Sequence, residues 1–243
     1  YRLTAPTSVD TSLKGYWSFD GQDIASTTAY DRSGAGKNLT LNNSPTPAGG
    51  RVGQGLSFDG TNDYASATYT PSGPNTLSAW IYPRSFADNP GIVGQLSPNY
   101  NSYGWGLSLD TSGNVHAISG NDNITWYNNL VAPVPLNQWS YVTATFSNCC
   151  NVAATGYLYI NGVQVASYTG TADTYPYNFA IGARDNTSGT VLNYFNGSID
   201  EVRIYNRALT ATEIKSLYDI AAPDKTNSSS SQAQGSGRLD SGL

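Results

Sequence analysis

The sequence predicts an all-β fold: a two-sheet antiparallel β-sandwich with one short C-terminal helix. Short strand-like runs separated by Gly, Pro, Asn and Asp recur along the 243 residues, and no long stretch with a 3.6-residue period precedes residue 209. The composition agrees, because Tyr occurs 18 times, Met is absent, and Glu occurs only at Glu201 and Glu213. β-favouring aromatics therefore prevail over strong helix formers.

The strand pattern is clearest at one hairpin. Asn161-Gly162 lies between two alternating runs and supplies the two positive-φ positions of a type I′ turn. From Val142 to Phe146, apolar residues alternate with threonine, which predicts a half-buried strand with one face turned inward and the other lining a surface or groove. We expect strands at 13–19, 55–58, 64–69, 76–82, 91–95, 104–109, 115–118, 124–128, 139–146, 156–160, 163–169, 178–182 and 195–206.

A single helix is predicted from about Ala211 to Asp219. Thr210 has the spacing of a capping residue, with Glu213 reaching back to it three positions later. Its apolar stripe consists of Ile214, Leu217 and Tyr218.

The chain divides into one domain and two linkers. Residues 1–12 are predicted to be an N-terminal linker, 13–222 the sandwich domain, and 223–243 a linker rich in Ser, Gly and Gln that cannot bury enough apolar surface to fold. Leu239–Leu243 resembles Val9–Leu13, which raises the hypothesis that the linker leads into a further repeat.

Charge and hydropathy exclude two classes of partner. A formal net charge of −5 with only 12% charged residues is not a nucleic-acid-binding footprint, which needs clustered Lys and Arg. No apolar run approaches the roughly 18 residues of a membrane-spanning helix, so we expect no membrane insertion by this segment.

The two cysteines, Cys149 and Cys150, are neighbours and cannot link distant parts of the chain. They form either a vicinal disulfide in an oxidising compartment or two loop thiols.

Six segments together resemble the laminin-G-like/concanavalin A-like lectin-glucanase superfamily, especially its bacterial form. Their order and spacing match over about residues 13–220, and the resemblance implies a jelly-roll sandwich in a secreted or cell-surface protein. The segments are Gly15–Gly21 (GYWSFDG), Asp31–Asn38 (DRSGAGKN), Gly53–Gly60 (GQGLSFDG), Leu77–Pro83 (LSAWIYP), Tyr159–Gly162 (YING) and Phe195–Leu209 (FNGSIDEVRIYNRAL).

The resemblance also implies a structural calcium ion. In such folds the first and last strands are antiparallel neighbours, which would bring Asp20 and Asp200 together, and in related sandwiches the corresponding last-strand Asp helps to hold Ca²⁺. Asp31 and Asn38, in a Gly-rich loop, would add ligands, since Ca²⁺ takes about six to eight oxygens.

The alternative for these acidic residues is turn chemistry. Asp20 and Asp31 would then cap turns, and Asp200 would pair with Arg203 or Arg32. Further metal candidates are Asp59 and Asp63.

No catalytic site is expected. Hydrolases of this superfamily carry a Glu-x-Asp-x-Glu-type cluster, and retaining chemistry needs two carboxyl groups about 5 Å apart. The only close acidic pair here is Asp200-Glu201, whose side chains should face opposite sides of a strand. His116, the sole histidine, has no recognisable catalytic neighbour and is predicted to be a surface or packed residue.

The central region has the residue types that bind sugars, because flat aromatic rings stack on sugar C–H surfaces while amides and carboxylates bond the hydroxyls. The alternative is that these rings pack beneath long loops. Trp17, Trp80 and Trp139 lie in strand motifs and are predicted to be framework residues. The candidate ligand-binding residues are Tyr100, Tyr103, Trp105, Trp126, Tyr127, Tyr175 and Tyr177.

Two functional classes remain. The first is a non-catalytic carbohydrate-binding or adhesion module whose partner is a glycan or cell-surface polysaccharide. The second is a structural repeat that contacts neighbouring protein modules in an array or filament. A glycoside hydrolase is the least favoured interpretation.

Overall fold

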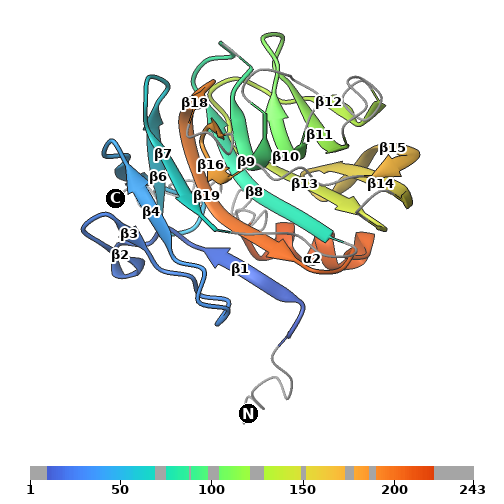
Figure 1. Cartoon of the computed structure of the whole chain (residues 1–243), viewed down its shortest axis with the longest axis horizontal. Coiled ribbons are helices and arrows are strands. Elements are labelled where there is room, and N and C mark those ends of the chain that lie inside the picture. Colours follow the sequence, from blue (N-terminus) through green and yellow to red (C-terminus); the bar gives the residue numbers. More distant parts are fainter. Residues whose placement is uncertain are drawn as a thin grey trace, which may run out of the picture.

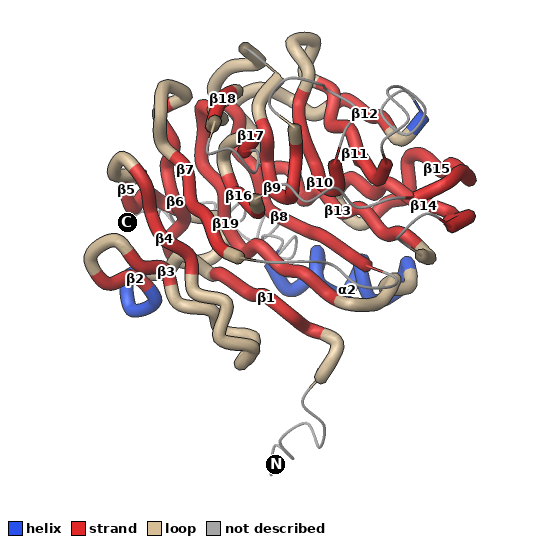
Figure 2. Tube along the Cα trace, viewed as in Figure 1, coloured by secondary structure: helices blue, strands red, loops and turns tan. Residues whose placement is uncertain are grey.

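The computed structural model of the chain describes residues 10–68, 75–87, 89–97, 104–120, 129–148, 152–172, 178–185 and 190–221. In this part, two antiparallel sheets pack face to face, with one α-helix near the C-terminal end (Figure 1; Figure 2). The predicted β-sandwich is confirmed.

Sheet A has eight strands within the described residues, in the order β15-β14-β13-β8-β19-β6-β5, with β1 also paired to β19. Its strands are β1 (Leu13–Trp17), β5 (Thr46–Gly49), β6 (Gln54–Asp59), β8 (Asn75–Pro83), β13 (Ser140–Phe146), β14 (Val152–Ile160), β15 (Val163–Ala172) and β19 (Asn196–Tyr205).

Sheet B has nine strands within the same residues, in the order β12-β11-β10-β9-β16-β7-β4-β3-β2. Its strands are β2 (Ile24–Ala25), β3 (Thr28–Ala29), β4 (Leu39–Asn42), β7 (Tyr64–Ala67), β9 (Gly91–Leu96), β10 (Gly104–Leu109), β11 (Asn114–Gly120), β12 (Val131–Pro133) and β16 (Phe179–Ile181). The remaining elements are a 3₁₀ turn η1 (Gly21–Asp23), a small hairpin of β17 (Arg184–Asp185) and β18 (Val191–Leu192), and the helix α2 (Ala211–Ala221).

The main core lies between the two sheets and is built by the inward-facing residues of both. Sheet A contributes Trp17 and Phe58 to this core, and sheet B contributes Trp105 and Phe179. The rings of Trp17 and Phe179 meet across the interface with centroids 5.7 Å apart. This burial of apolar surface is what holds the sandwich together.

Helix α2 builds a second apolar cluster on the outer face of sheet A, beside β8 and β19 (Figure 1). Tyr218 stacks on Trp80 with ring centroids 5.5 Å apart, and Ile214 is fully buried. The prediction that β13 is half-buried is wrong, because Thr143 and Thr145 are buried as well as the apolar residues that alternate with them.

The first and last strands are antiparallel neighbours, as the family resemblance implied. Strand β19 pairs with β6 through residues 196–199 and with β1 through residues 202–205. Where its partner changes, β19 contains a β-bulge between Asp200 and Arg203, and Glu201 has a φ of 53°. This junction is a natural place for a site, since a bulge re-aims side chains.

The predicted hairpin is confirmed: Asn161 and Gly162 have φ values of 53° and 77° between β14 and β15. The helix also forms where predicted, extending to Ala221. The strands that the sequence did not predict are short ones, mostly at sheet edges: β2, β3, β4, β5, β12, β17 and β18. The strand expected at 124–128 and the cysteine pair at 149–150 lie outside the described residues.

In the described part of the chain, no helix has the length and apolarity needed to cross a bilayer.

Candidate functional site

Asp20 and Asp200 converge on one loop, residues 50–54, which enters the junction between β1, β6 and β19. The backbone N–H of Gln54 donates to Asp20 Oδ1 at 2.9 Å. The N–H groups of Arg51 and Val52 donate to Asp200 Oδ2 at 2.7 and 2.9 Å. Two residues 180 positions apart thus fix the same turn, as expected from the pairing of the first and last strands.

Glycines in this loop make the close approach of the carboxylates feasible. A Cβ atom at Gly50 would collide with Asp200 Oδ2, and one at Gly53 would collide with Asp20 Oδ1. Gly53 also has a φ of 57°, a conformation that other residues rarely adopt.

Asp200 is an unusual carboxylate because it is fully buried. Its pKa is raised to about 7: burial is the largest cause, the N–H groups of Val52 and Arg51 act to lower the pKa, and the charge of Glu201 acts with burial to raise it. Its Oδ1 has no hydrogen-bond partner among the described residues. A buried oxygen of this kind suits a cation such as Ca²⁺, which would offset the charge that the protein interior disfavours.

Asp31 and Asn38 instead organise their own loop. Asp31 accepts hydrogen bonds from the backbone N–H groups of Tyr16, Ser33 and Lys37 and from the Ser33 hydroxyl. Burial acts to raise its pKa, but these hydrogen bonds prevail and lower it. Asn38 Oδ1 accepts the N–H of Asp31 at 3.0 Å. These contacts fit the turn-capping alternative for Asp31.

The ion pairs considered for Asp200 are not formed. Arg32 pairs with Asp23, and Arg203 pairs with Glu201, which also accepts the Tyr16 hydroxyl at 2.9 Å. The β-bulge between Asp200 and Arg203 interrupts the regular alternation of side chains that was expected for Asp200 and Glu201. The carboxylate of Glu201 pairs with Arg203. Among the described residues, no group of three or more His, Cys, Asp or Glu is placed to hold a metal.

Trp105, one of the candidate ligand-binding residues, is packed in the main core and is 0% exposed. Its ring therefore cannot stack on a ligand in this structure, and the prediction for it was wrong. Trp17 and Trp80 are buried framework residues as predicted, and Trp139 packs against Tyr82 with centroids 5.6 Å apart. The other candidates, Tyr100, Tyr103, Trp126, Tyr127, Tyr175 and Tyr177, lie outside the described residues.

A polar cavity of about 380 Å³ lies on the outer face of sheet B, which we call the β4–β7 cavity. Thr40 and Ser66 are cross-strand partners on β4 and β7, and their side chains point away from the core because Leu41 and Ala65 point into it. The cavity is lined by Asn38, Thr40, Ser66, Ala67, Thr68, Asn178 and Asp185.

Hydrogen bonds hold several lining groups in place. Asn42, which does not line the cavity, donates from Nδ2 to the lining Ser66 Oγ at 3.1 Å, and Asn178 Nδ2 donates to Asp185 Oδ1 at 3.4 Å. Asp185 is 5% exposed. The cavity therefore presents hydroxyl, amide and carboxylate groups with fixed positions.

Two partly exposed tyrosines lie beside this cavity. Tyr64, two residues before Ser66 on the same face of β7, contacts Tyr194 with ring centroids 6.4 Å apart and an interplanar angle of 49°. Burial raises the pKa of both phenols, and the nearby charge of Asp185 raises each further. Aromatic faces and polar hydrogen-bonding groups thus occur side by side, which is the combination that sugars require.

The sequence contained part of this signal. The alternation Tyr64, Ser66, Thr68 along a predicted strand places all three on one face. Asn178 and Asp185 were not predicted. Asn178 directly precedes β16, and Asp185 reaches the cavity after the turn between β16 and β17, whose path no local pattern specifies.

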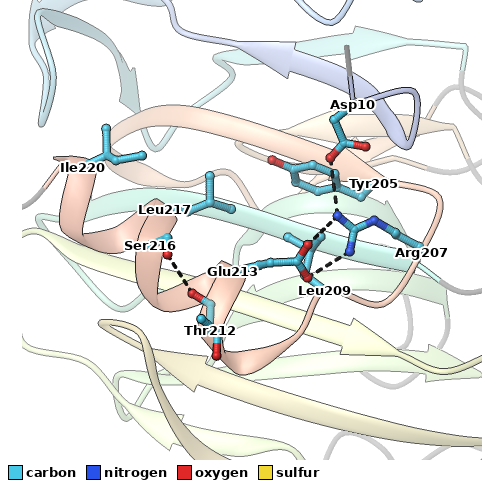
Figure 3. Close-up of a pocket in the computed structure, with 9 residues that line it drawn as sticks. All are labelled: Asp10, Tyr205, Arg207, Leu209, Thr212, Glu213, Ser216, Leu217 and Ile220. Carbon is cyan, nitrogen blue, oxygen red and sulfur yellow. Dashed lines mark hydrogen bonds and ion pairs between the residues drawn. The ribbon is translucent and has the colours of Figure 1, made fainter. Parts of the chain in front are cut away.

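A second cavity, of about 250 Å³, lies between α2 and the N-terminal segment (Figure 3). Figure 3 shows Arg207 bridging two acidic groups: it donates to Glu213 Oε1 at 2.7 Å and reaches Asp10 Oδ2 at 3.4 Å. Leu217 and Ile220 line the apolar side. Because Arg207 already ties the two ends of the domain together, we assign these polar groups to the structure of the domain.

Comparison with known proteins places the chain in a family. Residues 58–215 match the family model described as the concanavalin A-like lectin/glucanases superfamily. No curated protein sequence matches the chain.

Three solved structures share the fold. One is domain 4 of AbnA, an extracellular GH43 arabinanase from Geobacillus stearothermophilus, in complex with arabinotriose. Its sequence is 23% identical to this chain, the TM-score is 0.61, and the match covers 85% of this chain and 98% of the arabinanase domain. The binding domain of botulinum neurotoxin DC in complex with SialylT is 15% identical, with a TM-score of 0.64 and coverage of 89% and 53%.

The binding domain of Paraclostridial Mosquitocidal Protein 1 is 19% identical, with a TM-score of 0.60 and coverage of 88% and 53%. The chain thus spans about half of each toxin binding domain. From the family match and the shared jelly-roll architecture, the chain belongs to the concanavalin A-like lectin/glucanase superfamily.

Proposed function

We propose that this chain is a non-catalytic carbohydrate-binding module of a secreted or cell-surface protein. The observation that carries the proposal is the β4–β7 cavity, where hydroxyl, amide and carboxylate side chains lie beside the Tyr64–Tyr194 pair. Its volume of about 380 Å³ is within the usual range for small-molecule sites. The arabinotriose complex of the arabinanase domain and the SialylT complex of the neurotoxin domain support the same class of ligand.

The acidic residues described here support a binding role over hydrolysis. Asp59 and Asp63 are close, but they close a turn in which Asp59 Oδ1 accepts the N–H of Thr61 at 2.7 Å and Asp63 Oδ2 accepts the N–H of Asp59 at 3.2 Å. Glu201 is held by Arg203 and Tyr16. Neither arrangement resembles a pair of carboxyl groups facing across a substrate.

A structural Ca²⁺ ion at the junction of β1, β6 and β19 is part of the proposal. Asp200 Oδ1 and the carboxylate of Asp20 would hold it, with the backbone of the loop 50–54 nearby. The ion would supply positive charge to a buried carboxylate, and it would fix the loop between the first and last strands.

Glycan arrays and pull-down on insoluble polysaccharides identify the ligand, and calorimetry then measures its affinity. Replacing Tyr64→Ala should weaken binding about 5- to 30-fold, because contacts worth about 1–2 kcal/mol change an equilibrium by that factor. Tyr82→Ala is the matched control. Tyr82 is also partly exposed and its ring contacts another aromatic ring, that of Trp139, but it lies in β8 of sheet A, whereas the cavity lies on sheet B.

Binding by the Tyr82→Ala variant should equal that of the unmodified chain. If no glycan binds, or if Tyr64→Ala binds as tightly as the unmodified chain, the cavity is not a carbohydrate site.

A further inference from the structure

Asn42 adjoins both the aromatic pair and the β4–β7 cavity. It lies on β4 with its side chain on the outer face of sheet B, because the neighbouring Leu41 points into the core. Tyr64 on β7 is its cross-strand partner, and Thr40 and Ser66 form the next pair on the same face. Asn42 therefore has the ring of Tyr64 on one side and the hydroxyls that line the cavity on the other.

Two hydrogen bonds fix the orientation of the Asn42 amide. Its Nδ2 donates to the backbone carbonyl of Thr40 at 3.0 Å and to Ser66 Oγ at 3.1 Å. A backbone carbonyl can only accept, so the amide atom that faces it must be the nitrogen. Both N–H donors of the amide are used in this way, whereas no described residue donates to Asn42 Oδ1.

The same contact sets the role of the Ser66 hydroxyl. Its oxygen accepts from Asn42, so its hydrogen is left to donate elsewhere. Ser66 lines the cavity and is partly exposed, which allows that donor to reach a ligand. An acceptor, Asn42 Oδ1, and a donor, the Ser66 hydroxyl, thus lie next to each other beside Tyr64.

We propose that Asn42 is a specificity-determining residue of this site, and that with Ser66 it recognises two adjacent hydroxyls of a sugar whose apolar face stacks on Tyr64. This inference rests on the proposed carbohydrate-binding function. One sugar hydroxyl donates to Asn42 Oδ1, and its neighbour accepts from the Ser66 hydroxyl. A sugar that lacks either hydroxyl leaves one of these protein groups without a partner and therefore binds more weakly.

Monodeoxy sugars test the two contacts one at a time. The probes are glucose-, galactose- and arabinose-based oligosaccharides on an array, each with its monodeoxy analogues. For the unmodified chain, removal of either of two adjacent hydroxyls should weaken binding about tenfold, and removal of any other hydroxyl by less than about threefold.

Asn42→Ala should remove one of these two sensitivities. It should weaken binding of the parent glycan about tenfold, and it should bind one of the two sensitive analogues as tightly as the parent, because the hydroxyl that analogue lacks no longer has an acceptor. The other analogue should still bind about tenfold more weakly than the parent. If the unmodified chain and Asn42→Ala lose the same factor with every analogue, Asn42 does not contact the sugar.

Asn42→Asp separates the acceptor of Asn42 from its effect on Ser66. It keeps an oxygen acceptor and the shape of the side chain but has no N–H donor, so the Ser66 hydroxyl should turn to donate to the new carboxylate. Ser66→Ala should weaken binding about 5- to 20-fold in the unmodified chain but less than about twofold in the Asn42→Asp background. A merely structural role of Asn42 would give the same factor in both backgrounds.

Asn206→Asp is the matched control, because it makes the same change in charge at an exposed position directly after β19 of sheet A. It should leave the affinity for every analogue unchanged. Asn42 and Ser66 are both partly exposed, so their substitution leaves the core intact. Equal affinities of the unmodified chain and Asn42→Ala, or additive effects of Asn42→Asp and Ser66→Ala, would overturn this inference while leaving carbohydrate binding in place. If the unmodified chain binds no glycan on the array, the proposed function is overturned instead.

Discussion

Asp110 shows how one carboxylate can order a turn in this charge-poor chain. It follows β10 and accepts the backbone N–H groups of Ser112 and Asn114 at 2.8 and 2.9 Å, the Asn114 amide at 2.8 Å, and lies 3.0 Å from His116 Nε2. Burial acts to raise the pKa of Asp110, but these hydrogen bonds outweigh it and lower the pKa to about 2. His116, the sole histidine, is buried in β11 and contacts this turn through Asp110.

The lowered pKa predicts an acid-sensitive contribution to stability. Because the folded-state pKa of Asp110 lies below its ordinary value of 3.8, the stabilisation is fully present above about pH 4 and is lost as pH falls toward 2. Asp110→Asn should lower the free energy of unfolding by about 1–3 kcal/mol at pH 7, and by much less near pH 2. Urea unfolding at both pH values measures this, with Asp219→Asn as an exposed control. A pH-independent difference would mean that shape, and not charge, is what Asp110 contributes.

Some single residues could be assigned from the sequence, and others could not. The convergence of Asp20 and Asp200 followed from the expected pairing of the first and last strands. Trp105 was assigned wrongly, although it alternates with glycines and is in phase with Leu107, a pattern typical of a core-facing residue. Asp185 was beyond prediction, because a buried carboxylate brought in by a turn leaves no periodic signal.

Helix α2 depends on one face, and its two isoleucines allow a matched test. Ile214 is 0% exposed in the cluster on sheet A, whereas Ile220 is 82% exposed (Figure 3 shows it at the rim of the second cavity). Ile214→Ala should lower the free energy of unfolding by about 2–5 kcal/mol, and Ile220→Ala by less than about 0.5 kcal/mol. Chemical unfolding followed by the fluorescence of the five tryptophans, of which Trp80 lies in this cluster, measures both changes. Equal effects of the two substitutions would show that α2 is not held by this packing.

Strands and turns were predictable where their signal is local. The Asn161-Gly162 turn and the capping box of α2 formed as predicted: Thr210 Oγ1 accepts the N–H of Glu213 at 3.3 Å, and Glu213 accepts the N–H of Thr210 at 2.8 Å. Strand β5 was missed because it is short and contains Pro47, which is tolerated at the edge of a sheet. The buried outer face of β13 was also missed, because the helix that covers it is distant in sequence.

At the scale of the whole molecule, the sandwich is closed at the junction where β19 changes partner from β6 to β1. The loop 50–54 fills this junction, and the charge of Asp200 is buried beneath it. The folded-state pKa of Asp200, about 7, lies above its ordinary value of 3.8, so the ionisation of Asp200 lowers the stability of the fold as pH rises through this range. A bound cation would remove that cost.

The proposed Ca²⁺ ion should therefore stabilise the whole domain. With Ca²⁺ at 100 times its dissociation constant, linkage gives about 2.7 kcal/mol, which for a domain of this size raises the melting midpoint by roughly 5–10 °C at pH 8. Asp200→Asn should abolish this shift and, in chelator, should melt no lower than the unmodified chain because it buries no charge. Asp31→Asn should melt lower but keep the shift, since Asp31 serves its own loop. Scanning calorimetry with and without chelator measures the melting midpoints of the unmodified chain and of both variants. Identical midpoints for the unmodified chain in calcium and in chelator would exclude the ion, because a ligand that binds only the folded state must stabilise it.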